Sequence, residues 1–299
     1  MPLPQLLATL LALQPGPKDP ALAERIPQLL HTVYGSGDES QTAAAIDEAR
    51  QLFLKRGLLT VAEVGDEAAY EFVVLTCSPG PEEFQARVLA EAKRARARHA
   101  LPPDAVLYCE ARARQERVKD RARLHPPADP ALRDEIRRLY TGDQAVRQAT
   151  GFDIERMTRM DRENERPLKA IFESQGVPTY DMVGPEAASM FVVMVQHQSP
   201  DFRRQVLPRL KANVDAGQAD AADYSMVYDR AASEEGRKQR YGQHLECDDK
   251  SSTMHSMPIE DETHVDTRRA RIGLVRLALY VRMVKDFSAG MCPGAPTAK

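Results

Sequence analysis

Two side chains in the second half of the chain, His197 and Asp229, are of the types that carry out acid–base chemistry in enzymes. His197 follows the apolar stretch 187–195, which predicts that it lies at the C-terminal end of a buried helix. The helix dipole favours the imidazolium form there, whereas burial favours the neutral form, so we expect a general acid or base that titrates near neutral pH. Asp229 would orient the ring or take a proton. The structural alternative is a core histidine satisfied by a neighbour and an aspartate in an ion pair between helices.

Arg230 and the polar residues around it are the candidates for substrate binding. The planar guanidinium of Arg230 suits a carboxylate or a phosphate, and an ion pair that locks two helices is the alternative. Gly236 and Gly242 bracket a segment rich in hydrogen-bond donors, which is typical of a loop that closes over a polar ligand; a solvated basic loop is the other interpretation. The segment lacks the spacing and the Lys-Ser/Thr end of a P-loop. The candidate binding residues are Gln196, Arg230, Gln239, Tyr241, Gln243, Asp261, Arg268 and Arg269.

Two further groups of polar residues have simpler explanations than a site. Asp261 and Asp266 flank Arg268 and Arg269 on a predicted helix, at spacings that permit ion pairs within the helix at its surface. Four residues of metal-ligand types match no structural zinc pattern, namely His244, Cys247, His255 and His264. We therefore expect no bound metal, and since the sequence carries no cofactor motif, we expect no cofactor.

The elements that must position these residues are mainly helices. Gly184-Pro185-Glu186 predicts a helix start, because proline suits the first helical position and an acid complements the N-terminal dipole. Further helices are predicted over 199–216, 220–235, 262–271 and 275–286, with Pro208 as a kink in the first of them. The stretch 237–257 has few periodic signals, which predicts loops or short extended pieces. Strand signals are poor throughout, so the fold class is mainly α.

The chain also repeats itself. Residues 57–78 and 176–197 share glycines and apolar residues in one register, and Asp19-Pro20-Ala21-Leu22 is echoed by Asp129-Pro130-Ala131-Leu132. This pattern predicts two tandem copies of one helical module. Prolines between 125 and 130 suit a linker, so we place a degenerate N-terminal copy at 1–125, the site-bearing copy at 129–287 and a flexible tail at 288–299.

A comparison of the two copies singles out the site. Gln196 and His197 correspond to Cys77 and Ser78, and Asp229 corresponds to Ala111, whereas Arg230 keeps its counterpart in Arg112. A polar group needed only for folding would tend to persist in both copies. Only the second copy therefore keeps the groups that could form a working site.

The amino-acid composition limits the classes of function that the protein can have. The 299 residues are 42% hydrophobic with a net charge of −3, which argues against a protein that coats nucleic acid. No apolar run approaches the roughly 20 residues that span a bilayer, so we expect no membrane partner. The four cysteines form no CxxC pair, and we interpret them as reduced thiols of a cytoplasmic protein.

Residues from about 133 to 286 resemble a bacterial domain of unknown function, the DUF6624 family. The resemblance is carried by Val195-Gln196-His197, Pro200-Asp201-Phe202, Asp229-Arg230, the segment 236–242, Pro258-Ile259-Glu260-Asp261, 265–269 and Ile272-Gly273-Leu274. Similar proteins read Tyr-Gly-Thr-Gln where this chain has Tyr241-Gly242-Gln243-His244, as though one residue were missing. The resemblance locates the site and implies no reaction.

These residues support three hypotheses. The leading one is an enzyme that performs metal-independent acid–base chemistry, including hydrolysis, on a small polar or peptide-like substrate, with Arg230 as the anion anchor. The second is a non-catalytic module that binds a small molecule, a peptide or a partner protein, with the first copy as a scaffold or homodimer surface. The third is that all these polar groups form a structural network.

Overall fold

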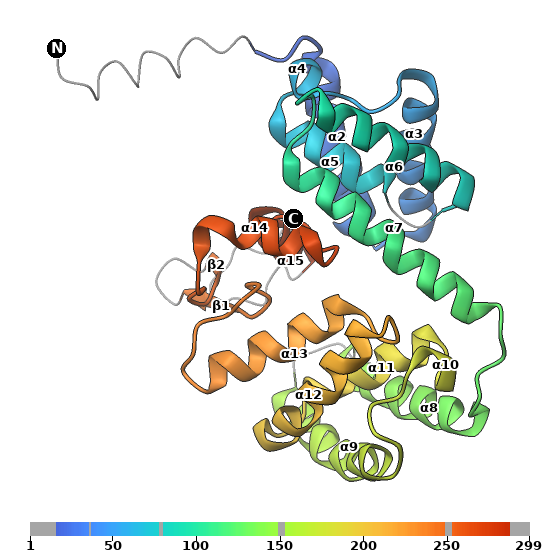
Figure 1. The fold of residues 1–299 in the computed structure, drawn as a ribbon. Coiled ribbons are helices and arrows are strands. Elements are labelled where there is room, and N and C mark those ends of the chain that lie inside the picture. Colours follow the sequence, from blue (N-terminus) through green and yellow to red (C-terminus); the bar gives the residue numbers. More distant parts are fainter. Residues whose placement is uncertain (1–15, 36, 78–79, 149–152, 249–252, 288–299) are drawn as a thin grey trace. The chain divides into compact units, whose positions relative to one another are not determined.

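The computed structural model describes residues 16–35, 37–77, 80–148, 153–248 and 253–287, and the chain divides into two compact units, 1–109 and 110–299 (Figure 1). The boundary falls inside the helix α7 (Pro103–Arg123), before the linker at 125–130 where the sequence led us to place it. No proline interrupts α7 after its first residue. Its second half belongs to the second unit, where Lys119 Nζ lies 2.5 Å from Asp220 Oδ2 and Gln115 donates to the Ile272 carbonyl.

The protein is mainly α, as the sequence predicts, with one small two-stranded sheet. The first unit contains α2 (Pro20–Gly35), α3 (Glu39–Arg56), α4 (Val61–Val64), α5 (Asp66–Thr76), α6 (Glu82–Ala97) and the start of α7. The second unit contains α8 (Pro130–Arg147), α9 (Ile154–Gln175), α10 (Tyr180–Val183), α11 (Pro185–Val195), α12 (Pro200–Asp215), α13 (Ala221–Glu234), β1 (Leu245–Asp248), β2 (Thr253–Ser256), the 3₁₀ turn η1 (Glu262–His264), α14 (Val265–Arg271) and α15 (Leu277–Phe287). Strands β1 and β2 pair antiparallel, with Leu245 opposite Ser256.

Helix α11 is the centre of the second unit's core. It begins with Pro185 after Gly184, whose φ of 84° places it in backbone space that glycine alone enters readily. Phe191, Val192 and Val195 are almost fully buried, because α8, α9 and α13 pack around the helix. The buried helix therefore delivers the residues that follow it, Gln196 and His197, to the place where its neighbours converge.

Helices α2 to α6 of the first unit have counterparts, in the same order, in α8 to α12 of the second unit. Helices α4 and α10 have 4 residues each, α5 and α11 have 11, and α6 and α12 have 16. Gly65 and Gly184, which join the short helix to the buried one, have φ/ψ of 85°/167° and 84°/159°. Edge-on phenylalanine pairs also match, Phe53 with Phe84 at 5.2 Å and Phe172 with Phe202 at 5.7 Å. Tandem copies of one module would show these features, and the duplication stands as our interpretation of them.

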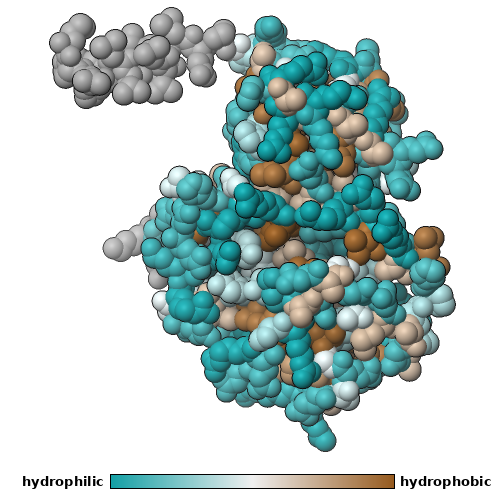
Figure 2. All heavy atoms as spheres, viewed as in Figure 1, coloured by the Kyte–Doolittle hydropathy of each residue, from teal (hydrophilic) through white to brown (hydrophobic). Residues whose placement is uncertain are grey.

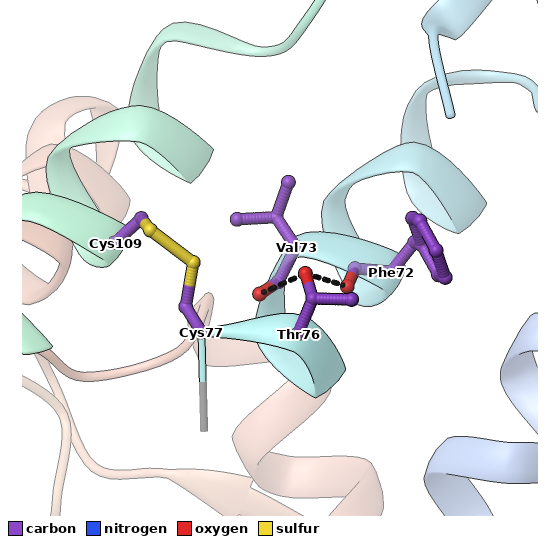
Figure 3. Close-up of a disulfide and its surroundings, with 5 residues drawn as sticks. All are labelled: Phe72, Val73, Thr76, Cys77 and Cys109. Carbon is purple, nitrogen blue, oxygen red and sulfur yellow. Dashed lines mark hydrogen bonds between the residues drawn. A yellow bond between two sulfur atoms is a disulfide. The ribbon is translucent and has the colours of Figure 1, made fainter. Parts of the chain in front are cut away.

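The expectation of reduced cysteines is wrong. Cys77, which follows α5, and Cys109 of α7 form a disulfide with their Cα atoms 5.5 Å apart (Figure 3). Beside it, the Thr76 hydroxyl donates to the Phe72 carbonyl at 2.8 Å, so the end of α5 is closed by its own side chain. Cys247 is disulfide-bonded as well. Cys77 and Cys109 are 32 residues apart in sequence, and only the packing of α5 and α7 brings them together, so their spacing gives no sign of pairing.

The described surface is mostly hydrophilic in the view of Figure 2, with apolar side chains in small groups. Among the described residues, the large hydrophobic side chains that are exposed are Leu54, Leu124 and Ile154, on separate elements. Within the same residues, no helix has the length and apolar character needed to cross a membrane.

Candidate functional site

His197 lies in the turn that ends α11, where its backbone N–H donates to the Met194 carbonyl at 3.1 Å. The side-chain nitrogen of Gln196 lies 3.3 Å from His197 Nε2. Burial, reinforced by the positive charge of Arg147, lowers the pKa of His197 to about 4. Asp143 opposes this shift, and Arg230 and Arg203 add to it. Because burial and three arginines lower its pKa, His197 is neutral at neutral pH, whereas the sequence predicted a group that titrates near neutral pH.

One side of His197 is acidic. The fully buried Asp143 of α8 accepts from Arg147 Nε at 3.0 Å and from Arg147 Nη2 at 3.1 Å. The same Nη2 also donates to Asp161 of α9. Asn164 and Gln144 supply further donors to Asp143 at 3.5 and 2.9 Å. Two carboxylates therefore share one guanidinium here, and burial raises the pKa of Asp161 although Arg147 opposes the rise.

Sequence reasoning missed this acidic group, and a signal for it existed. When the Asp19 and Asp129 echoes are continued without a gap, Asp143 corresponds to Val33 and Arg147 to Gly37. The loss of a reactive side chain from the first copy, which singled out His197, thus applies to Asp143 and Arg147 as well.

The other side of His197 is basic. Arg203 of α12, with a side chain only 2% exposed, donates to the Gln196 carbonyl at 3.0 Å and to the Gln198 carbonyl, and it pairs with Glu234. Arg230 of α13 approaches the same Glu234, with its Nε 3.4 Å from Oε1. Burial lowers the pKa of the His244 imidazole, and the positive charge of Arg230 adds to this shift. The sequence interpretation treated His244 only as a metal-ligand type.

Asp229 has different partners from those we expected. It is fully buried, and its carboxylate accepts backbone N–H groups from Arg240 at 2.8 Å, Tyr241 at 3.1 Å and Gln243 at 2.9 Å. Burial raises its pKa, and these three hydrogen bonds oppose the rise. Both carboxylate oxygens are thus committed to the 236–243 loop, and the contacts of Asp229 are structural rather than directed at the His197 ring.

Other predicted binding residues hold the 236–243 loop in place through hydrogen bonds. Gln239, which is fully buried, donates to the carbonyls of His244 at 2.8 Å and Met257 at 3.1 Å, and it accepts from the His244 N–H at 2.7 Å. Gln243 donates to Ser225 Oγ at 3.0 Å. These bonds attach the loop to the start of β1, the segment after β2, and α13. Gln239 and Gln243 therefore form part of the framework.

The remaining predicted residues hold the loop from α14. Arg269, fully buried, donates to the Tyr241 carbonyl at 2.5 Å and to the Val275 carbonyl at 2.6 Å. Arg268 donates to the Arg240 carbonyl at 3.0 Å and lies 3.4 Å from Asp261 Oδ2. Of the sequence-predicted residues, the structure thus gathers Gln196, His197 and Arg230 in one cluster, and it places the others in the support of the neighbouring loop.

Three of the four residues of metal-ligand types are engaged separately. Cys247 is in a disulfide, His255 Nε2 lies 3.2 Å from Glu246, and His264 Nδ1 lies 2.9 Å from Asp261. Throughout the described segments, no group of three or more His, Cys, Asp or Glu side chains is arranged to hold a metal ion.

Comparison with known proteins places the site within a family. Residues 130–291 match the family described as a family of unknown function, DUF6624. This stretch contains His197, the acidic and basic groups around it, and the 236–243 loop. Searches of curated proteins and of solved structures found no match.

Proposed function

Since this chain belongs to the DUF6624 family, whose function is unknown, we propose its function from the site alone: an enzyme that uses neutral His197 as a general base. The chemistry is metal-independent, includes hydrolysis, and acts on a small polar or peptide-like substrate. One observation carries this proposal: a histidine whose pKa is about 4 lies among three arginines. An imidazole that is neutral at neutral pH has a ring nitrogen free to accept a proton. The arginines make it a weaker base, but they would stabilise negative charge that develops beside it.

The role proposed for each residue follows from its contacts and from the exposed fraction of its side chain. Arg230 is the anion anchor, because its side chain is 38% exposed, whereas those of Arg147 and Arg203 are 20% and 2% exposed. Gln196 orients the His197 ring through the contact at Nε2. Asp143 and Arg147 set the charge around the ring. In place of the orienting role expected from the sequence, Asp229 holds the loop.

The test is a turnover screen of the full chain on esters, amides, phosphate esters and glycosides. His197→Gln should abolish any turnover found, while His255→Gln, a change at an exposed histidine of β2, should leave it unchanged. The rate should be constant around neutral pH and fall as the pH approaches about 4, where His197 becomes protonated. Turnover that survives His197→Gln would refute the assignment of the base.

A second candidate is a non-catalytic binding module, with the first unit as a scaffold or homodimer surface. The observation in its favour is that Asp229, Gln239 and Arg269 are all committed to framework contacts, which leaves few polar groups for chemistry. This candidate predicts saturable ligand binding that Arg230→Ala removes, with no product formed on any substrate of the screen.

The disulfides change the proposed location. A cytoplasmic protein was expected because the cysteines were interpreted as reduced, and pairing of Cys77 with Cys109 removes that reason. We propose that the protein matures in an oxidising compartment, where such bonds persist.

Closing a loop of this length stabilises the fold by about 4 kcal/mol in the chain-entropy model. Cys77→Ser should therefore lower the midpoint of thermal unfolding, and the natural chain should show a Cys77–Cys109 linked peptide by mass spectrometry. Free thiols at both positions in protein from its native source would refute this.

A further inference from the structure

Several buried polar atoms on the basic side of His197 have no hydrogen-bond partner among the described residues. They include Arg203 Nε, Arg230 Nε and His244 Nδ1. Buried polar groups in folded proteins are nearly always hydrogen-bonded, and each exception calls for an explanation. The first two of these atoms are obligate donors. Arg230 Nε lies 3.4 Å from Glu234 Oε1 without forming a hydrogen bond, so the cluster can offer N–H groups to a further acceptor.

The charges on the two sides of His197 are unequal. On one side two carboxylates, Asp143 and Asp161, share Arg147. On the other side two guanidiniums, Arg203 and Arg230, share the single carboxylate of Glu234. Counted against Glu234 alone, the two guanidiniums have an excess of one positive charge, which Asp161 offsets in part through its interaction with Arg230. Burial lowers the pKa of Arg203, Glu234 opposes this shift, and the charge of Arg230 adds to it.

Three other carboxylates face this group, and each is already paired. Asp161, on which Arg230 acts, is bound to Arg147. Glu165 binds Lys169 Nζ at 2.5 Å and the Ser199 hydroxyl at 2.8 Å. Glu246 of β1 is exposed and pairs with His255 at 3.2 Å, so solvent screens its effect on the cluster. Among the described residues, no ion pair joins any of these three carboxylates to Arg203 or Arg230.

We propose that Arg203, Arg230 and His244 bind an oxyanion, a carboxylate or phosphate group of the substrate on which His197 acts. A guanidinium pair with unused donors matches the oxygens of such a group. The 38% exposed side chain of Arg230 gives the anion access from solvent. Arg203 donates to the carbonyl of Gln196, the residue before His197, at 3.0 Å, and the charges of Arg203 and Arg230 act on both His197 and His244, so the bound anion would lie beside the proposed base. The position of the reacting bond therefore rests on the proposed function, whereas the anion site itself does not.

The test is titration calorimetry of the full chain with inorganic phosphate and, separately, with acetate, which distinguishes the two oxyanion types. We expect saturable binding of at least one of them, weakened by about tenfold to a hundredfold in Arg230→Met, since a hydrogen bond to a charged group accounts for such a factor. His244→Ala should weaken it as well. Arg203 is left intact in this test, because its loss would leave Glu234 and two carbonyls without their donor.

The controls separate this inference from the catalytic proposal. Arg133→Met removes a guanidinium that pairs with Asp134 at the start of α8, about 21 Å along the helix from Arg147, and it should leave anion binding unchanged. His197→Gln should also keep anion binding while it loses turnover. Binding that is absent for both anions, or that Arg230→Met and Arg133→Met affect equally, would overturn the anion site. Anion binding without turnover on any substrate would support the anion site and refute the enzyme.

Discussion

Replacement of Asp229 separates a structural carboxylate from a catalytic one. Asp229→Ala leaves the backbone N–H groups of Arg240, Tyr241 and Gln243 without their acceptor, in a place where the carboxylate itself has no solvent exposure. A buried donor that loses its partner costs about 1–3 kcal/mol, and the break of a buried charged network costs about 3–5 kcal/mol. We therefore expect a loss of about 4 kcal/mol in the free energy of unfolding.

The expected loss is large enough to measure by thermal unfolding. The second unit has 190 residues, and for a domain of this size 1 kcal/mol shifts the midpoint by roughly 2–4 °C. Asp229→Ala should therefore lower the midpoint by roughly 8–16 °C. Asp229→Asn, which keeps the shape and one acceptor oxygen, should lower it by about half as much. Amide hydrogen exchange should accelerate over residues 240–243 in both variants.

His197→Ala is the matched comparison. The ring's side-chain contact is with Gln196, and a neutral histidine leaves no unpaired charge behind, so we expect a midpoint within about 4 °C of the wild type, or about 1 kcal/mol. An unchanged midpoint for Asp229→Ala, with unchanged exchange at the loop amides, would refute the structural role of Asp229. Falls above 6 °C in both variants would instead favour the hypothesis of one structural network.

Two further predictions concern pH and backbone geometry. Burial raises the pKa of Asp223 to about 7. Its protonated form therefore stabilises the fold, and this contribution is complete below the pKa of the unfolded chain. The contribution is up to about 4 kcal/mol, and it is lost as the pH rises towards 7. The lowered pKa of His197, about 4, acts oppositely, since its stabilising effect is lost as pH falls from 6.5 to 4. Denaturant unfolding from pH 4 to 7 checks this. In His197→Gln, where Asp223 remains, the free energy of unfolding should fall as the pH rises, and in Asp223→Asn, where His197 remains, it should rise. Equal dependence on pH in the two variants would contradict this. Gly65→Ala and Gly184→Ala should each destabilise their unit by about 1–3 kcal/mol, because both glycines occupy the same left-handed region. Clearly unequal losses would count against equivalent positions in a duplicated module.

The anion site and the base together offer a way to find the natural substrate. If phosphate binds more tightly than acetate, the turnover screen should concentrate on phosphate esters, and the reverse result would direct it to carboxylate-bearing amides and esters. The affinity for the anion alone thus narrows the chemistry before any reaction is observed.

Local patterns were sufficient for the helical architecture. Gly184-Pro185 marks the start of α11, and the uninterrupted apolar stretch after it predicts a buried helix, because capping and hydrophobic burial act within a few residues of each other. The same locality explains why His197 and Arg230 could be selected from the sequence. Each differs from its surroundings in residue type, and for His197 the comparison with the first half adds a second signal.

What the sequence could not decide is which polar groups meet. Asp143, Arg203 and Arg230 come from three helices, and they all act on His197 only because α8 and α13 pack against α11 and α12 packs against α13. Asp229, adjacent to Arg230 in sequence, lies on a different side of α13 and binds the 236–243 loop, since successive helical residues point about 100° apart. The Cys77–Cys109 disulfide likewise depends on the packing of α5 and α7. The amino-acid sequence thus determined the helices and the chemistry that each residue can offer, whereas the partners of each residue were set by long-range packing, which only the tertiary structure decides.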